Sequence, residues 1–131
     1  MFITFEGIDG CGKTTQLEML VKVLEKQHSL LVTKEPGGSS IGKKIRAILL
    51  DQENHQIVPE TELLLYLADR CQHLQEKIKP ALEANQVVLC DRYHDATLAY
   101  QGGGRQLQLD WLEPIVPVSY THLTLPTILR V

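Results

Sequence analysis

The stretch Gly7-Ile8-Asp9-Gly10-Cys11-Gly12-Lys13-Thr14 fits the pattern G-x-x-x-x-G-K-[ST], in which glycines frame a loop that ends in a lysine and a hydroxyl. Glycines allow the backbone to curl so that successive N–H groups point at phosphate oxygens. Lys13 is then expected to reach the β and γ phosphates of a nucleotide, and the Thr14 hydroxyl to bind Mg²⁺. The stretch therefore predicts a phosphate-binding loop over residues 7–14.

The flanking sequence supports this interpretation. Residues 2–5, Phe-Ile-Thr-Phe, are rich in β-forming side chains and predict a strand. After the loop, apolar residues recur at the i, i+3, i+4 and i+7 positions of one helical face: Leu17, Leu20, Val21 and Leu24. A strand, a glycine loop and a helix thus follow in the order of a P-loop, where the helix N-terminus adds partial positive charge beside the phosphates.

A second strand and helix follow. Residues 30–33 predict a strand, and Pro36-Gly37-Gly38 predicts its turn. Ser39 or Ser40 is then expected to cap a helix. The apolar stripe of this helix is expected to be Ile41, Ile45, Ile48 and Leu49.

The third unit begins with a long helix that is expected to open near Pro59, since proline suits the first turn. Its predicted apolar stripe is Leu63, Leu64, Leu67, Leu74 and Ile78. Pro80 should kink or divide it. Residues 87–90 form a continuous apolar run, as in a parallel strand covered on both faces, and residues 96–100 begin another helix. Three βα units in series predict an α/β domain with a parallel sheet and flanking helices.

Composition and charge narrow the class of protein. The chain has 131 residues, of which 44% are apolar and 22% charged, as expected for one globular domain. A formal net charge of -3 gives no long-range attraction for nucleic acid. The apolar runs are too short to cross a membrane, and no signal peptide is recognisable, so we expect a cytoplasmic protein. Three cysteines without C-x-x-C spacing argue for reduced thiols and against zinc.

Further polar residues lie where ligands bind in open α/β sheets. Asp91 ends the apolar run 87–90 and is expected to lie on the Mg²⁺ side, although a structural cap is the alternative reading. Arg92 follows it. Aromatic, hydroxyl and arginine side chains then recur at helical spacing: Tyr93, Thr97 and Tyr100, with Tyr66 and Arg70 on the long helix. Together they favour a pocket for a nucleotide base. Each aromatic residue taken alone also fits the hydrophobic core.

Four stretches carry a resemblance to a known family: residues 5–15, Lys34-Glu35-Pro36-Gly37-Gly38, Asp91-Arg92-Tyr93, and residues 99–105, Ala-Tyr-Gln-Gly-Gly-Gly-Arg. Together they resemble bacterial thymidylate kinases, over nearly all of residues 1–114. The resemblance implies Mg²⁺-dependent transfer of phosphate from ATP to dTMP, giving dTDP. It also implies a five-stranded parallel sheet in the order 2-3-1-4-5, a homodimer packed through helices, and a mobile lid over the ATP.

The resemblance also implies roles for individual residues. Asp9 would bind the sugar 3′-hydroxyl, Arg46 and Arg92 the acceptor phosphate, and Arg70 the thymine edge. The remaining assignments place Tyr66 against the ring, Thr97 and Tyr100 along the pocket, and Lys13, Asp9, Asp91 and Arg92 in the catalytic group. Glu35 fits either an acid facing magnesium-bound water or a direct substrate contact. Tyr66 replaces a frequent phenylalanine, and Lys34 a common arginine.

The last stretch of the chain differs from the rest. One codon spelling of residues 118–127 matches a transposase adapter used in sequencing libraries, so we interpret residues 117–131 as a non-native tail, with a β-hairpin as the alternative. Residues 1–116 are then the N-terminal portion of a P-loop nucleotide kinase domain, truncated after about the third strand and its helices. The lid and last strands would be missing, the first strand would be an exposed edge, and the chain would be inactive alone.

Two alternatives to a thymidylate kinase stay open from the residues. Another P-loop kinase, for a nucleoside or a different nucleotide, would keep Lys13 and Asp91 but differ around Arg70 and Tyr100. The fragment could also be a non-catalytic nucleotide-binding module, since it has the phosphate loop without a lid.

Overall fold

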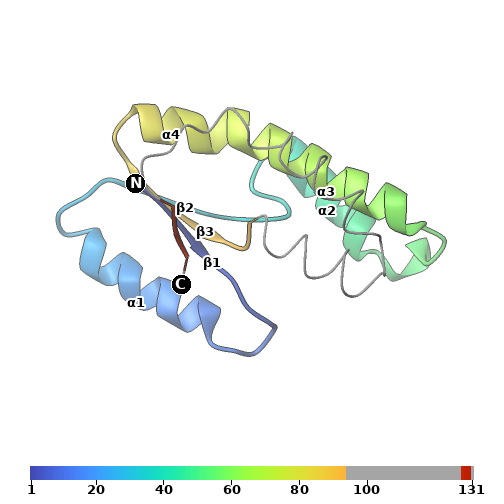
Figure 1. Ribbon diagram of the computed structural model, residues 1–131, viewed down its shortest axis with the longest axis horizontal. Coiled ribbons are helices and arrows are strands. Elements are labelled where there is room, and N and C mark those ends of the chain that lie inside the picture. Colours follow the sequence, from blue (N-terminus) through green and yellow to red (C-terminus); the bar gives the residue numbers. More distant parts are fainter. Residues whose placement is uncertain (94–127, 131) are drawn as a thin grey trace.

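The computed structural model describes residues 1–93 and 128–130 (Figure 1). Its elements are β1 (Phe2–Phe5), α1 (Lys13–Leu24), β2 (Leu30–Lys34), α2 (Ser40–Leu50), the 3₁₀ turn η1 (Gln52–Asn54), α3 (Pro59–His73), the π-helical turn η2 (Leu74–Ile78), α4 (Lys79–Glu83), β3 (Val87–Asp91) and β4 (Ile128–Arg130). Strands and helices alternate along residues 1–93, which confirms the predicted α/β class. The helix expected at residues 96–100 lies outside the described residues.

Within the described ranges the sheet has four parallel strands in the order β2-β3-β1-β4. Phe2 is paired with Val88 of β3, and Val88 is paired in turn with Leu31 of β2. The order of β2, β3 and β1 agrees with the first three positions of the expected 2-3-1-4-5 arrangement, and β4 occupies the fourth position although the strands after the third were expected to be missing. The strand order places the carboxyl ends of β1, β2 and β3 at one edge, where their following loops meet.

The structure corrects the expectation that β1 would be an exposed edge. Three residues of the segment interpreted as a non-native tail, Ile128, Leu129 and Arg130, pair in parallel with Phe2, Ile3 and Thr4. The physical reason is that the edge of β1 presents N–H and C=O groups that a short apolar segment can satisfy.

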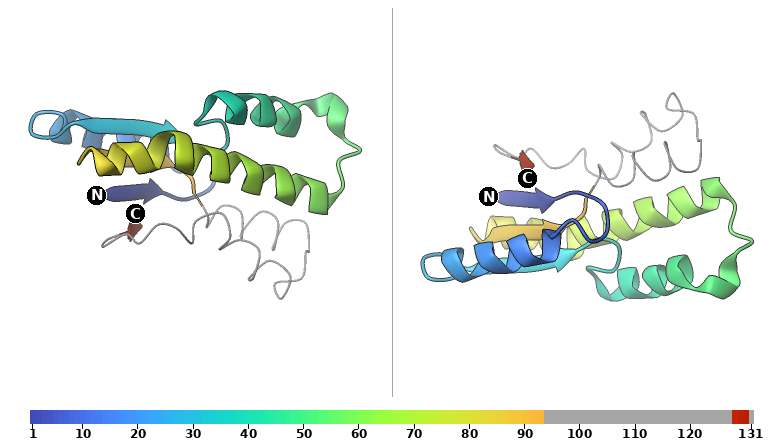
Figure 2. Two further views of the ribbon diagram at one scale, coloured as in Figure 1. Left: turned by 90° about the horizontal axis from the view of Figure 1, so that it is seen from above. Right: turned by 90° about the horizontal axis from the view of Figure 1, so that it is seen from below.

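Both faces of the sheet are covered, as predicted for the run 87–90. On one face the side chains of Phe2, Val88 and Cys90 pack against Leu74 and Ile78 of the long helix. On the other, Ile3, Phe5, Val87 and Leu89 pack against Leu17, with Leu20, Val21 and Leu24 partly buried beside them. Figures 1 and 2 show α1 on one side of the sheet and α3 with α4 on the other. The alternating side chains of each strand thus supply two separate cores.

The long helix is continuous from α3 through η2 to α4, and its turn widens just before Pro80. Lys79 donates its N–H to the carbonyl of Leu74, five residues earlier. Proline lacks an N–H and clashes with the carbonyl four residues before it, and the wider π turn absorbs that conflict. The predicted disturbance at Pro80 therefore takes the form of a π turn that leaves the helix unbroken.

Two predicted apolar stripes are partly wrong. Leu64 on α3 and Ile41 and Ile48 on α2 are exposed by 55%, 48% and 44%. Helix α2 lies beside α3 and away from the sheet (Figure 2), so its buried position is Gly42, packed against Asp69. The predicted cap is correct, because the Ser39 hydroxyl accepts the N–H of Gly42 at 2.9 Å. No helix within residues 1–93 is long and apolar enough to cross a lipid bilayer.

Candidate active site

The phosphate-binding loop connects the end of β1 to the first turn of α1. Gly12 caps α1 with φ 91° and ψ 9°, a left-handed conformation that residues with a Cβ adopt at a cost. Thr14 lies in the first turn of this helix. The predicted strand, loop and helix are therefore confirmed, and the helix N-terminus opens at the carboxyl edge of the sheet.

Lys13 is folded back over its own loop. Its Nζ donates to the carbonyl oxygens of Gly7 at 2.9 Å and Ile8 at 2.7 Å, and lies 3.8 Å from the thiol of Cys11. The ammonium group thus lies over the loop formed by residues 7–14. Whether it contacts a phosphate stays a prediction.

The residue after β3 joins this strand to the loop. Arg92 has a positive φ of 69°, and its backbone is held on both sides, since its N–H donates to Phe5 O at 3.0 Å and its carbonyl accepts from the Cys90 thiol at 3.1 Å. Its guanidinium is paired with Asp9 at 2.5 Å. An arginine in this rare backbone conformation, aimed at the phosphate loop, is typical of a functional position.

Asp91 ends β3 beside the loop. Its backbone carbonyl accepts the N–H of Glu35 at 3.0 Å, which ties the end of β3 to the end of β2. Its Oδ1 is buried and has no hydrogen-bond partner among the described residues. A buried carboxylate oxygen of this kind can coordinate a cation.

A buried hydrogen-bonded chain lies under the turn after β2. The two oxygens of Glu35 are held separately: Oε2 accepts from Nε of Arg70 at 2.8 Å, and Oε1 lies 2.9 Å from Nδ1 of His73. The other ring nitrogen, Nε2, lies 2.7 Å from the Thr33 hydroxyl. Neither interpretation of Glu35 from the sequence described this arrangement, in which its carboxylate anchors Arg70.

Arg70 is fixed on two sides. Its NH2 donates to the carbonyl of Tyr93 at 2.8 Å, and its guanidinium carbon lies 5.0 Å from the centre of the Tyr93 ring. Burial alone would lower the pKa of Arg70, but the Glu35 carboxylate beside it raises that pKa above its usual value. Arg70 therefore stays charged although its side chain is only 2% exposed.

The turn at residues 36–38 is held from two helices. Asp69 of α3 accepts the N–H of Gly37 at 3.0 Å, and Arg46 of α2 donates to the carbonyl of Pro36 at 2.9 Å. Gly38 lies against the ring of His73, where a Cβ would come within 2.3 Å of Nε2. Burial raises the pKa of Asp69, while the Gly37 N–H acts to lower it.

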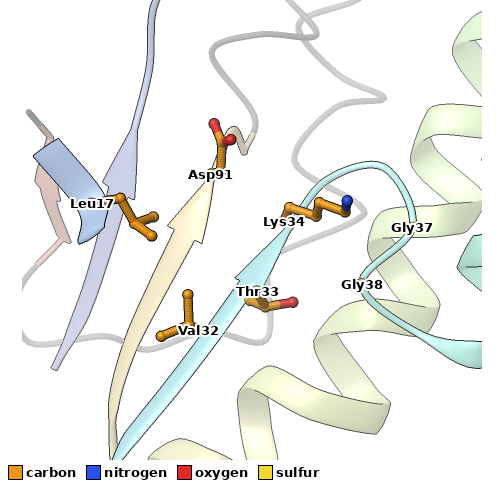
Figure 3. A pocket seen from close by; sticks show the side chains of 7 residues that line it. All are labelled: Leu17, Val32, Thr33, Lys34, Gly37, Gly38 and Asp91. Atoms are coloured by element: carbon orange, nitrogen blue, oxygen red, sulfur yellow. The ribbon is translucent and has the colours of Figure 1, made fainter. Parts of the chain in front are cut away.

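A cavity of about 340 Å³ lies among these elements and is lined by Leu17, Val32, Thr33, Lys34, Gly37, Gly38 and Asp91. In Figure 3 the side chains of Leu17 and Val32 face it from α1 and β2, and those of Asp91 and Lys34 lie at the strand ends. Its size falls in the lower range of small-molecule sites.

The structure brings together most of the predicted site residues. Asp9 and Arg92 are paired, and Glu35, Arg46 and Arg70 surround one turn. Tyr66 is half-buried one helical turn before Arg70. Tyr93 instead packs in the core, where its ring meets Phe2 edge-on at 5.1 Å. Thr97 and Tyr100 lie outside the described residues.

Sequence reasoning missed three residues of the site: Thr33, Asp69 and His73. Their partners lie 32 to 40 positions away in the chain, so no local pattern marks them. The spacing of Asp69 and His73, four residues apart and flanking Arg70, is the one signal that could have placed them on the same helical face.

A P-loop between β1 and α1, an acid and an arginine at the end of β3, and parallel strands with helices on both faces define a P-loop kinase. Comparisons with known proteins identify the family. The thymidylate kinase family model matches residues 5–122, so the chain belongs to the thymidylate kinase family.

Similar proteins agree with this assignment. A thymidylate kinase from Geotalea uraniireducens is 62% identical over 107 residues, covering 81% of this chain and 50% of the relative. One from Geobacter sulfurreducens is 59% identical over 110 residues, covering 83% and 52%. The crystal structure of thymidylate kinase from Ehrlichia chaffeensis superposes with a TM-score of 0.87 at 34% identity, covering 99% of this chain and 73% of that one. The chain spans about half the length of the curated relatives.

Proposed function

We propose that this chain is the N-terminal part of an enzyme that transfers a phosphoryl group from ATP to dTMP. The observation that carries the proposal is the position of Arg92, whose guanidinium is paired with Asp9 of the phosphate loop. Arg70 lies deeper and donates to the carbonyl of Tyr93, the next residue along the chain. A donor phosphate on the loop would thus face the side chain of Arg92, whose planar fork suits the phosphate of an acceptor nucleotide.

The reaction requires positioning and charge neutralisation more than covalent chemistry, because the attacking group is already a phosphate oxygen. On the donor side, the backbone N–H groups of residues 7–14 and the ammonium of Lys13 would hold the β and γ phosphates. On the acceptor side, Arg92 and Arg46 would hold the phosphate of dTMP. Asp9, now paired with Arg92, would accept the sugar 3′-hydroxyl.

Thr14 and Asp91 are suited to bind Mg²⁺. Both offer oxygen donors, which Mg²⁺ prefers, and Oδ1 of Asp91 has no hydrogen bond among the described residues. When bound, the ion would neutralise charge on the transferring phosphates. Two protein ligands would suffice, since Mg²⁺ in such sites keeps waters and takes the rest of its ligands from the substrate.

Base recognition would fall to the long helix. Arg70 is rigid and charged, as required of a donor to the thymine edge, and Tyr66 lies one turn earlier, where its ring could stack on the base. Thr97 and Tyr100 complete this proposal from outside the described residues.

The test is a chimera of residues 1–116 with the C-terminal half of the Geotalea uraniireducens relative, which is 62% identical in the matched part. We expect a higher kcat/KM for dTMP than for dUMP, dCMP or dGMP, with Lys13→Ala as the control for host kinase. A preference for a purine monophosphate would overturn the proposal. The 131-residue chain is itself expected to bind ATP weakly and to form no dTDP, since it spans about half the length of its curated relatives and a transferring phosphoryl group needs several preorganised cations.

We further infer that the whole enzyme is a cytoplasmic homodimer. Apolar side chains remain exposed on the outer helices, among them Ile48 on α2 and Leu64 on α3, which suits packing of helices between two copies. Cys11 and Cys71 are exposed thiols without a disulfide, as is usual in a reducing compartment. Sedimentation of the chimera tests the dimer, which Leu64→Glu should dissociate.

A further inference from the structure

His73 is a buried titratable residue for which the proposed reaction has no role. Its side chain is 0% exposed, and both ring nitrogens have polar neighbours, Glu35 at 2.9 Å and Thr33 at 2.7 Å. A buried polar group is costly unless it is hydrogen-bonded, so the burial of His73 depends on these two partners. Its neighbours decide what it does there.

The Glu35 carboxylate fixes one ring proton of His73, the one on Nδ1. A carboxylate only accepts hydrogen bonds, so Nδ1 of His73 must carry a proton and donate it to Oε1 of Glu35. The Thr33 hydroxyl can then donate to Nε2. The resulting chain runs from Thr33 through His73 and Glu35 to Arg70, and every link is 2.7 to 2.9 Å long.

The series of hydrogen bonds ends at Arg70, the residue that would contact the base. The Glu35 carboxylate has one oxygen on Arg70 and the other on His73. With His73 in place, the carboxylate cannot rotate, and Nε of Arg70 has a fixed acceptor. Without the ring, Oε1 would be buried and unsatisfied, and the carboxylate would turn or draw in water.

We propose that His73 is a positioning residue for base recognition, which acts by fixing Glu35 and through it the direction of the Arg70 guanidinium. This inference rests on the proposed function, because it assumes that Arg70 contacts the base. The ring also lies against Gly38, so the same side chain supports the turn from β2 toward α2.

The variants follow from the chemistry of the ring. His73→Asn keeps an N–H donor close to the position of Nδ1, whereas His73→Leu has a similar size and no donor. Thr33→Val removes the hydroxyl that faces Nε2 and keeps the shape of the side chain. All three are measured in the chimera described above, beside the parent.

We expect His73→Leu to raise KM for dTMP about tenfold, as loss of a buried hydrogen-bond partner commonly does, with KM for ATP unchanged. The preference for dTMP over dCMP should fall by a similar factor, because a misdirected Arg70 no longer distinguishes the base edges. His73→Asn should restore both quantities to within about threefold, and Thr33→Val should shift them in the same direction as His73→Leu by less than about tenfold.

A direct readout needs no catalysis. In the 131-residue chain labelled with ¹⁵N-histidine, the signal that disappears in His73→Leu belongs to this ring. A proton on Nδ1 supports the proposal, and an unprotonated Nδ1 overturns it, since such a ring cannot donate to Glu35.

The experiments distinguish failure of the proposed function from failure of the role proposed for His73. If the parent chimera does not phosphorylate dTMP, the proposed function fails and takes the inference with it. If the parent is active but His73→Leu lowers only thermal stability, or the Asn and Leu variants show the same base preference, His73 is merely structural and the inference alone is overturned.

Discussion

The guanidinium of Arg92 is bonded to the carboxylate of Asp9 at 2.5 Å, across 83 positions of sequence. The Asp9 side chain is 96% exposed, and ion pairs in solvent contribute little to folding stability. The role of the pair is therefore to position a side chain: it holds Arg92, which follows β3, over the phosphate loop.

Replacing Arg92 by lysine keeps a cation but loses the planar fork that suits a phosphate. We expect kcat/KM for dTMP to fall by a factor of about a hundred to a thousand in the chimera, as for other lost electrostatic donors. The unfolding midpoint should stay close to that of the parent. Lys22→Arg, in the last turn of α1, is the matched control for exchanging one cationic side chain for another away from the loop. A stable variant with full activity would show that Arg92 does not contact the acceptor.

Lys13→Ala should abolish dTDP formation in the chimera, because it removes the cation on the β and γ phosphates. Cys11→Ala should leave kcat nearly unchanged, since this position of the loop contributes its backbone N–H and its thiol lies 3.8 Å from Lys13 Nζ. Steady-state assays of both variants decide this. Equal losses would mean that the Cys11 thiol has a chemical role.

Local patterns predicted the loop of residues 7–14 because a P-loop needs its glycines, lysine and hydroxyl within one stretch. The stripes of α2 and α3 were less well predicted, since apolar spacing at Ile48 and Leu64 shows a helical face without showing what it packs against. The link between Glu35 and His73 was missed because its partners are 38 positions apart. Only the tertiary fold brings β2 beneath α3.

Gly38→Ala tests the fit of the turn on His73. The new Cβ would lie 2.3 Å from Nε2, so we expect the chain to lose about 1–3 kcal/mol of stability in urea unfolding, as overpacked sites do. In the background of His73→Ala the same change should cost less, because the ring is gone. A double-mutant cycle measures the coupling, and additive effects would show that the clash is relieved elsewhere.

Asp69 predicts a pH dependence of stability. Burial raises its pKa in the folded chain above the reference value of 3.8, so the folded state holds this proton more tightly than the unfolded state. Stability is therefore lost as pH rises from about 3.8 through the raised pKa. Asp69→Asn removes this contribution and still accepts the Gly37 N–H, so its stability relative to the parent should increase with pH across that window. Urea unfolding at pH 4 and pH 7 checks this, and a constant difference would contradict it.

Residues 117–131 can be tested by removal. Because Ile128, Leu129 and Arg130 pair with β1, deletion should expose the edge of that strand and lower solubility and protection from protease. Sedimentation and limited proteolysis of the shortened chain measure both. A shortened chain that behaves like the parent would favour a non-native tail that adds nothing to the fold.

The position of Lys13 has a consequence for which nucleotides the loop admits. Because its ammonium is bonded to the carbonyls of Gly7 and Ile8, these carbonyls compete with a ligand for the lysine, and a ligand must break both hydrogen bonds to recruit it. Apparent affinity is reduced by the fraction of loops that are not competent. A triphosphate offers several oxygens to recruit the lysine, whereas a monophosphate offers few. We therefore expect residues 7–14 to favour a nucleoside triphosphate over a nucleoside monophosphate.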